Sequence, residues 1–150
     1  MINKKDFNIR EYHSKDEKQV IELWYTCDLI VPWNNPKLDI ERKLKVNPEL
    51  FLIGELNDKV IASVMGGYEG HRGWINYLAV LPEYRGNGFA REIMKVVEQK
   101  LKNIGCPKIN LQIRSSNKEV IKFYERIGYF DDHMTSMGKI LSKDPSYKMF

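Results

Sequence analysis

The sequence predicts one α/β domain spanning residues 1–150, with a central mixed sheet flanked by about four helices. Segments that alternate apolar and polar residues, as strands do, are interleaved with segments whose apolar residues recur at the helical period. One pair of strands is joined by a short turn, which predicts an antiparallel hairpin. Later strands are separated by helices, which provide the crossovers that parallel neighbours need. A sheet built from both kinds of connection is mixed.

Composition agrees with one domain that buries an ordinary core. The chain has 150 residues, of which 43% are hydrophobic and 29% charged. No apolar stretch approaches the ~20 residues of a membrane span, and the charged N-terminus lacks the apolar region of a secretory signal. The two cysteines, Cys27 and Cys106, form neither a disulfide framework nor a zinc pattern. We therefore expect a cytoplasmic protein that binds no metal and no membrane.

The first third of the chain predicts a strand and two helices. Residues 7–12 alternate as a strand, and Ser14 with Glu17 fits the capping box that begins a helix. The apolar stripe of that helix is Val20, Leu23, Trp24 and Cys27. Residues 28–36 hold two prolines and two asparagines, which indicates a loop, and a short helix is expected around residues 39–46.

The middle of the chain predicts three consecutive strands. Residues 51–56 and 59–68 flank the short turn Asn57-Asp58, which is typical of a hairpin. Residues 74–81 form a fourth strand, whose nearly continuous apolar end indicates a central position covered on both faces.

A long helix is expected after residues 85–90, with Gly105 as its stop. Its buried stripe is predicted to contain Phe89, Ile93, Val96 or Val97, Leu101 and Ile104. Residues 108–113 then alternate as a strand.

Ser116 and Glu119 fit a second capping box, which begins a helix that ends at Gly128. That helix is expected to bury Val120, Ile121, Tyr124 and Ile127. Residues 129–141 can supply two closing strands.

Positive charge is concentrated in the second half of the chain. Residues 1–75 contain 11 Lys and Arg against 12 Asp and Glu, whereas residues 76–150 contain 13 against 8. This bias fits either an anionic ligand bound by the second half or ordinary solvated surface. Because no stripe of clustered Lys and Arg is present, we do not expect a nucleic-acid partner.

A small-residue turn lies between a strand and a helix, in the sequence Arg85-Gly86-Asn87-Gly88-Phe89-Ala90. The first amides of a helix have no partner within the helix, and together with the helix dipole they form an anion site suited to a pyrophosphate. The alternative is that the glycines only make a turn. The string matches neither a P-loop nor the full dinucleotide-binding pattern, which argues against those two sites.

This segment resembles the acetyl-CoA motif of the GNAT N-acetyltransferases, (Q/R)-x-x-G-x-(G/A). The preceding Leu78-Ala79-Val80 resembles the family's fourth strand, where a bulge and a splay expose backbone groups to the pantetheine arm. Asn117 and the string from Phe123 to Tyr129 resemble its closing motif, N-x(6)-Y-x(3)-G-[FY]. The resemblance covers about residues 6–141. The loop from Cys27 to Asn34 and the string at residues 65–73 look like the small bacterial YpeA-like branch.

The resemblance implies a GNAT-like fold and an acetyl-CoA-dependent N-acetyltransferase. Such an enzyme moves an acetyl group to a primary amine by direct attack on the thioester. The acceptor, a small molecule or a protein N-terminus, is not identified by the sequence, and a homodimer is compatible with the family. The implied cofactor contacts are Leu78, Ala79, Val80, Arg85, Gly86, Asn87, Gly88, Phe89, Ala90, Asn117 and Tyr124.

Tyr124 is the candidate general acid for the leaving thiolate, because a phenol keeps its proton at neutral pH. It lies seven residues after Asn117, which puts the two on one helix face. Each has a second interpretation: Tyr124 as a core residue of the apolar stripe, and Asn117 as a helix cap.

Glu69 and His71, in the turn before the fourth strand, are the candidate bases, with solvated turn residues as the alternative. Trp33 and Asn34 lie in the loop that the resemblance places at the acceptor pocket, where they supply an apolar face and a hydrogen bond. A buried Trp anchor is the competing interpretation of Trp33.

A different class of function is also compatible with the sequence. A non-catalytic sensor of acetyl-CoA or CoA would keep the anion turn without a working base. Acetyl transfer, measured directly, separates it from the enzyme.

Overall fold

The computed structural model describes residues 2–148, and they divide into two compact units. The first unit runs to Asn110 and includes the tail from Asp144, and the second is Leu111–Lys143. The first unit holds the whole sheet, in the strand order β1-β2-β3-β4-β5. Its strands are β1 (Phe7–Glu11), β2 (Phe51–Leu56), β3 (Lys59–Tyr68), β4 (Gly73–Val80) and β5 (Ile109–Asn110).

The sheet is mixed, which confirms the predicted class. Strands β1 to β4 pair antiparallel, whereas β4 and β5 pair parallel. The β2–β3 hairpin turns at Asn57 and Asp58, whose φ angles of 50° and 65° are those of the tight turns that suit hairpins. Asparagine and aspartate tolerate this left-handed conformation better than most residues do.

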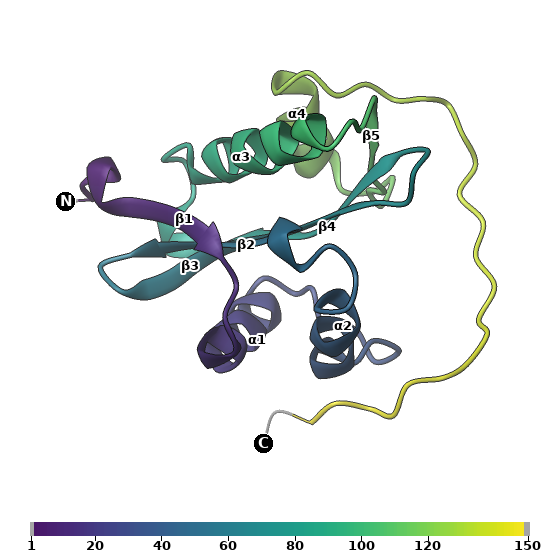
Figure 1. Cartoon of the computed structure of the whole chain (residues 1–150), viewed down its shortest axis with the longest axis horizontal. Helices are drawn as coiled ribbons and strands as arrows, with labels where there is room; N and C mark the ends of the chain where they lie inside the picture. The colour runs from purple at the N-terminus through teal and green to yellow at the C-terminus, as the bar shows by residue number, and fades with distance from the viewer. Residues whose placement is uncertain (1, 149–150) are drawn as a thin grey trace. The chain divides into compact units, whose positions relative to one another are not determined.

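Three helices of the first unit cover both faces of the sheet. In Figure 1, α3 (Phe89–Asn103) lies on one face, and α1 (Glu17–Thr26) and α2 (Pro36–Lys43) lie on the other. Apolar side chains from both layers form the core; its largest fully buried members include Trp24, Phe51, Ile53, Ile61, Phe89 and Ile93. The two-sided burial predicted for the end of β4 is visible in Ala79 and Val80, which are buried, and Leu78 is half-buried.

Two helix starts differ from the sequence prediction. A short 3-10 turn at Ser14–Asp16 precedes α1. The capping box is formed by His13 and Asp16 instead of Ser14 and Glu17: the Asp16 carboxylate accepts from the His13 backbone N–H at 2.9 Å. Helix α2 begins three residues earlier than expected. The Asn35 side chain caps it by accepting from the Leu38 N–H, and Pro36 fits the first helical position because it needs no N–H partner there.

Helix α3 ends as predicted, with Gly105 at a φ of 90°. Its buried stripe contains Met94, which the periodicity missed, and excludes Ile104, which is 46% exposed. Ile104 is the C-cap residue, one position beyond the last residue of the helix.

The second unit contains α4 (Lys118–Arg126) and the extended segment that follows it. Tyr124 is its buried helical residue, while Val120, Ile121 and Ile127 are half-buried. Asn117 caps α4 by accepting from the Val120 N–H at 3.3 Å, so the cap predicted at Ser116 is wrong by one position.

The predicted closing strands do not form: residues 129–141 are extended chain without strand pairing. A strand needs a partner edge, and β5 is only two residues long instead of the six expected. Without pairing, the apolar side chains of this segment remain exposed; they are Phe130, Met134, Met137, Ile140 and Leu141.

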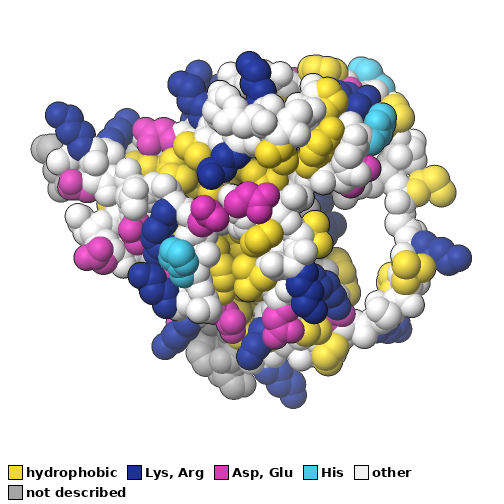
Figure 2. Space-filling view, viewed as in Figure 1, with side chains coloured by type: hydrophobic (Ala, Val, Ile, Leu, Met, Phe, Trp, Pro, Cys, Tyr) yellow, Lys and Arg dark blue, Asp and Glu magenta, His cyan; other side chains and the backbone are white. Residues whose placement is uncertain are grey.

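Surface charge is mixed on the face shown in Figure 2, where Lys and Arg side chains are interspersed with Asp and Glu. Within residues 2–148, no helix has the length and apolar character needed to cross a membrane.

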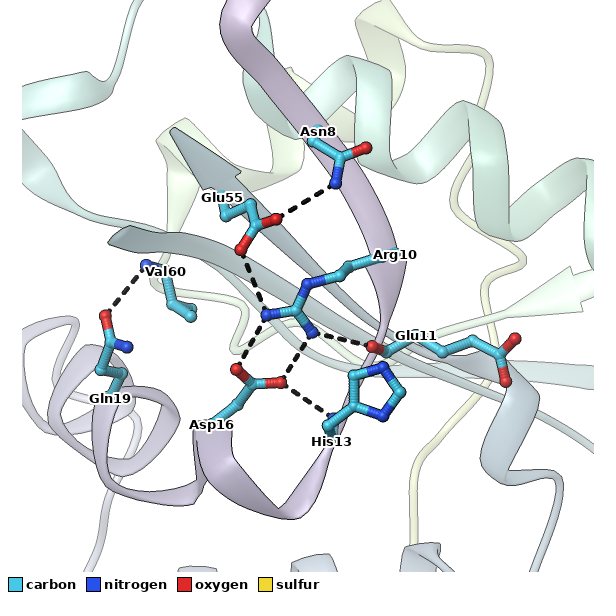
Figure 3. A network of polar contacts seen from close by, with 8 residues as sticks. All are labelled: Asn8, Arg10, Glu11, His13, Asp16, Gln19, Glu55 and Val60. Carbon is cyan, nitrogen blue, oxygen red and sulfur yellow. Dashed lines mark hydrogen bonds and ion pairs between the residues drawn. The ribbon is translucent and has the colours of Figure 1, made fainter. Parts of the chain in front are cut away.

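A charged network fixes β1 to the start of α1 (Figure 3). The Arg10 guanidinium donates to both Asp16 oxygens, at 2.8 and 2.9 Å, and to Glu55 of β2 at 3.1 Å. Burial alone would raise the pKa of Asp16, but its bonds from Arg10 and the His13 backbone outweigh this and lower the pKa. The bonds from Arg10 and Asn8 likewise lower the pKa of Glu55.

These lowered pKa values predict an acid-sensitive fold. A carboxylate with a depressed folded pKa stabilises the protein above its unfolded pKa of about 4, and this contribution is lost as the pH falls through the folded pKa. Asp16→Asn should therefore destabilise the protein most at pH 7, with the difference from wild type shrinking below pH ~4. Urea unfolding across pH measures it. Glu22→Gln, on the exposed face of α1, is the control, and a pH-independent difference for Asp16→Asn would contradict the mechanism.

Candidate active site

A bulge interrupts β4 near its end. Ser63 pairs with Ala79 and Met65 with Asn76, so the two residues between Asn76 and Ala79 oppose one residue of β3. Tyr77 takes up the extra length with a φ of 52°. This left-handed conformation is costly for a bulky residue, and strain of this kind persists only where its surroundings enforce it.

A buried polar chain enforces the bulge. The Trp24 indole N–H donates to the Ser63 hydroxyl at 2.8 Å, and that hydroxyl donates to the Tyr77 carbonyl at 2.8 Å. The Tyr77 ring stacks on the Trp24 indole, with centroids 3.8 Å apart. Ser63 and Trp24 are completely buried, so each polar group in the chain depends on its neighbour for a hydrogen bond.

Beyond the bulge, no strand among residues 2–148 pairs with β4 on the side away from β3, and we call this side the open edge. Strand β5 pairs with β4 only at Gly73 and Trp74. The Leu81 N–H donates to the Ile61 carbonyl at 2.9 Å. Because antiparallel bonds alternate along a strand, the Val80 N–H and carbonyl then point away from β3, toward the open edge. Val80 thus has its backbone N–H on this side of β4, while its carbonyl accepts from the Cys27 thiol and the Arg85 side chain.

The glycine turn adjoins this edge at the N-terminus of α3. Gly86 and Gly88 have φ angles of 81° and 83°, which L side chains rarely adopt, and the space around both is open. The Asn87 side chain donates to the Tyr84 carbonyl at 2.9 Å, which stabilises the turn. Phe89 is buried and Ala90 half-buried, so they anchor the helix while its first amides face outward. The turn therefore fits an anionic group.

Arg85 links the turn to the end of β4. Its Nε donates to the Val80 carbonyl at 3.0 Å, and its Nη2 lies 3.4 Å from Cys27 Sγ. Burial raises the pKa of the Cys27 thiol, although the contact with Arg85 opposes this. Arg85 is itself exposed, so its guanidinium adds positive charge beside the helix N-terminus.

Glu69 and His71 lie in the exposed turn before β4. The Glu69 carboxylate accepts from the backbone N–H groups of Arg72 and His71, and these bonds lower its pKa. This turn is at the beginning of β4 and Val80 is at its end, roughly 20 Å away at strand spacing. Neither side chain is brought to the open edge.

The loop at residues 32–34 precedes α2, whose Asp39 contacts Tyr77 of the bulge. Trp33 is 64% exposed, so it is not the buried anchor of the competing interpretation. Asn34 is half-buried, and its side chain slightly opposes the rise in the pKa of the Tyr77 hydroxyl. That hydroxyl donates to Asp39 of α2 at 2.7 Å. Burial and the Asp39 carboxylate raise the pKa of Tyr77, which therefore stays protonated.

Sequence reasoning missed Ser63, Tyr77 and Asp39. Ser63 carried a signal, since it is a lone polar residue inside an apolar strand. The other two carried none, because their meeting depends on the bulge.

In the second unit, Tyr124 packs edge-on against Phe123 and Tyr129, with ring centroids 5.1 and 5.3 Å away. The Asn117 carboxamide oxygen is occupied by the cap, which leaves its amide group for donation. Among residues 2–148, no cluster of three His, Cys, Asp or Glu side chains is arranged to hold a metal ion.

Comparison with known proteins shows the family of this chain. Residues 18–129 match the acetyltransferase (GNAT) family. An acetyltransferase of Yersinia pestis is 48% identical over 139 residues, which cover 93% of this chain and 99% of that protein.

Solved structures show the same fold. Ard1 from Thermoplasma volcanium superposes with a TM-score of 0.76 at 22% identity, over 83% of each chain. A chain of the NatC complex, solved with a Gag peptide and CoA, gives 0.71 at 22% identity, over 83% of this chain and 85% of that one. The chain belongs to the GNAT family, and it is an acetyltransferase.

The buried chain through Ser63 predicts a specific instability. Ser63→Ala leaves the Trp24 N–H and the Tyr77 carbonyl without their partner, so the free energy of unfolding should fall by about 2 kcal/mol. Urea unfolding measures this change. Ser142→Ala, an exposed serine, should be neutral. A neutral Ser63→Ala would show that the bulge does not depend on this hydroxyl.

Proposed function

We propose that this protein is an acetyl-CoA-dependent N-acetyltransferase that acetylates a primary amine of a small molecule or a protein N-terminus. One observation carries the proposal: the open edge of β4 at Val80 adjoins a glycine turn at a helix N-terminus. An extended chain with a pyrophosphate at one end is complementary to such a surface. The family match runs through both compact units, which supports one N-acetyltransferase domain.

The cofactor residues divide into two roles. The amides of residues 86–90 and the Arg85 guanidinium bind the pyrophosphate, and the outward backbone groups of residues 78–80 hydrogen-bond the pantetheine arm and the thioester carbonyl. A carbonyl that gains negative charge during attack is stabilised by a preorganised N–H, and the Val80 amide has that orientation. Asn117 and Tyr124 complete the cofactor contacts.

Tyr124 is proposed as the general acid. Its hydroxyl supplies the proton that the CoA thiolate requires on leaving. Glu69 and His71 lie at the far end of β4, too far from Val80 to accept the proton of the amine directly. We therefore assign that proton to water. Trp33 and Asn34 shape the acceptor site.

The function is tested with a panel of amines, acetyl-CoA and a free-thiol readout. We expect thiol release that depends on the amine, with the acetylated amine identified by mass spectrometry. Acetyl-CoA binding without transfer to any amine would indicate the sensor instead.

Gly88 provides a test of the cofactor site. Gly88→Glu places bulk and negative charge against the pyrophosphate, so acetyl-CoA affinity measured by calorimetry should fall about 10-fold or more. Gly105→Glu is a matched control at the other end of α3, because Gly105 has a similar φ of 90° and equally open surroundings. Equal affinities for the two folded variants would contradict the assignment.

Tyr124→Phe keeps the aromatic ring and removes the hydroxyl group that is proposed to protonate the CoA thiolate. We expect kcat to fall by ~10²–10⁴-fold with acetyl-CoA affinity almost unchanged. Tyr129→Phe, which removes the hydroxyl of the neighbouring ring, is the control. Steady-state kinetics and thermal midpoints are measured on the same preparations, and a kcat close to wild type, with chemistry rate-limiting, would refute the acid role.

A further inference from the structure

The last residues of β4 have few backbone contacts within the sheet. Within residues 2–148, β4 pairs with β3 beyond the bulge only through Ala79 and Val80. The Leu81 N–H adds one bond to β3, at 2.9 Å. Pro82 then begins a 3-10 turn and has no N–H with which to continue the ladder. The direction of the Val80 amide is therefore not fixed by the sheet alone.

Arg85 supplies a bond that the sheet does not. Its Nε donates to the Val80 carbonyl at 3.0 Å, and the Cys27 thiol donates to the same carbonyl at 3.4 Å. Arg85 Nη2 lies 3.4 Å from the Cys27 sulfur, so the three groups contact one another. Because burial raises the pKa of Cys27, the thiol keeps its proton at neutral pH and can act as a donor. The Val80 carbonyl is thus held both from the end of α1 and from the glycine turn.

Holding the carbonyl also sets the direction of the Val80 N–H. In an extended residue the N–H and the carbonyl point to the same side of the strand, so a carbonyl held on the open edge keeps the N–H on that edge. The other end of the peptide group between Val80 and Leu81 is fixed by the Leu81 N–H, which bonds to β3. A peptide group that is bonded at both ends resists rotation.

We propose that Arg85 is a positioning residue for the reacting thioester: by binding the Val80 carbonyl through Nε, it keeps the Val80 N–H directed at the thioester carbonyl. This inference rests on the proposed acetyl transfer, in which that N–H stabilises the negative charge on the carbonyl oxygen. A donor contributes most when its orientation is fixed before the reaction, because no free energy is then spent on turning it. Attraction of the pyrophosphate is a separate role, which requires only the positive charge of the guanidinium.

Two substitutions separate the position of the donor from the charge. In Arg85→Gln the side-chain amide nitrogen follows the same three carbons as Nε does in arginine, so a donor is kept there and the charge is lost. In Arg85→Lys the charge is kept, but a methylene replaces Nε and the ammonium lies one bond further out. Arg72→Lys is the matched control, because Arg72 also donates to a backbone carbonyl, that of His71 at 2.9 Å, but beside the beginning of β4.

The experiment observes the bound thioester directly, without turnover. Acetyl-CoA labelled with ¹³C at the thioester carbonyl is added to saturation to the full-length wild type and to each variant. The carbonyl resonance is recorded by NMR, since a hydrogen bond to the oxygen moves the carbon resonance downfield. Calorimetry on the same preparations gives the Kd for acetyl-CoA, and kcat is measured with the amine that releases thiol fastest.

We expect a downfield shift on binding to the wild type, Arg72→Lys and Arg85→Gln, and loss of most of that shift in Arg85→Lys. The kcat should fall at least ~10-fold in Arg85→Lys and less than ~3-fold in Arg85→Gln. Affinity for acetyl-CoA should fall more in Arg85→Gln, because this variant lacks the charge.

Three results overturn the inference: no shift in the wild type, a shift and a kcat that are unchanged in both Arg85 variants, or values that are kept in Arg85→Lys and lost in Arg85→Gln. The last result would show that Arg85 acts through its charge alone. The expected shifts without transfer to any amine would refute the proposed function while supporting the positioning of the Val80 amide by Arg85.

Discussion

The site depends on one hydroxyl group that is completely buried. Ser63 accepts from the Trp24 indole and donates to the Tyr77 carbonyl, and so joins α1, β3 and the bulge of β4 in one polar chain. An unpaired buried donor or acceptor costs about 1–3 kcal/mol, which is comparable to the strain of a left-handed tyrosine. We therefore infer that these buried hydrogen bonds offset the strain at Tyr77 and stabilise the bulge.

Two further features of β4 lie close to the bulge. Along the backbone, pairing with β5 ends after Trp74, so the Val80 amide faces an open edge beside the glycine turn. The Tyr77 side chain donates to Asp39 of α2. In the function that we propose, this one irregularity bears on both the cofactor site and the acceptor site, which direct transfer between two substrates requires to be close together.

Much of this fold could be predicted from periodicity and turn residues, because strands β1 to β4 and all four helices depend on local patterns. The prediction of two closing strands in residues 129–141 was wrong, because strand formation depends on pairing with another strand and this segment has no strand partner in the structure. The glycine turn could be predicted from the sequence, because Gly86 and Gly88 adopt positive φ angles that favour glycine. The contact between Tyr77 and Asp39 could not be predicted, because a bulge changes which side chains meet and does not appear in the alternation of apolar and polar residues.

The most direct test of the account is the location of CoA on the protein. Backbone amide shifts, followed by NMR as CoA is added to the ¹⁵N-labelled full-length chain, map the contact residue by residue. The account predicts the largest changes at Val80 and at residues 86–90. Unchanged signals there, with the main changes instead in the shallow hollow between β1 and α3 that Ile9 and Val96 line, would contradict it.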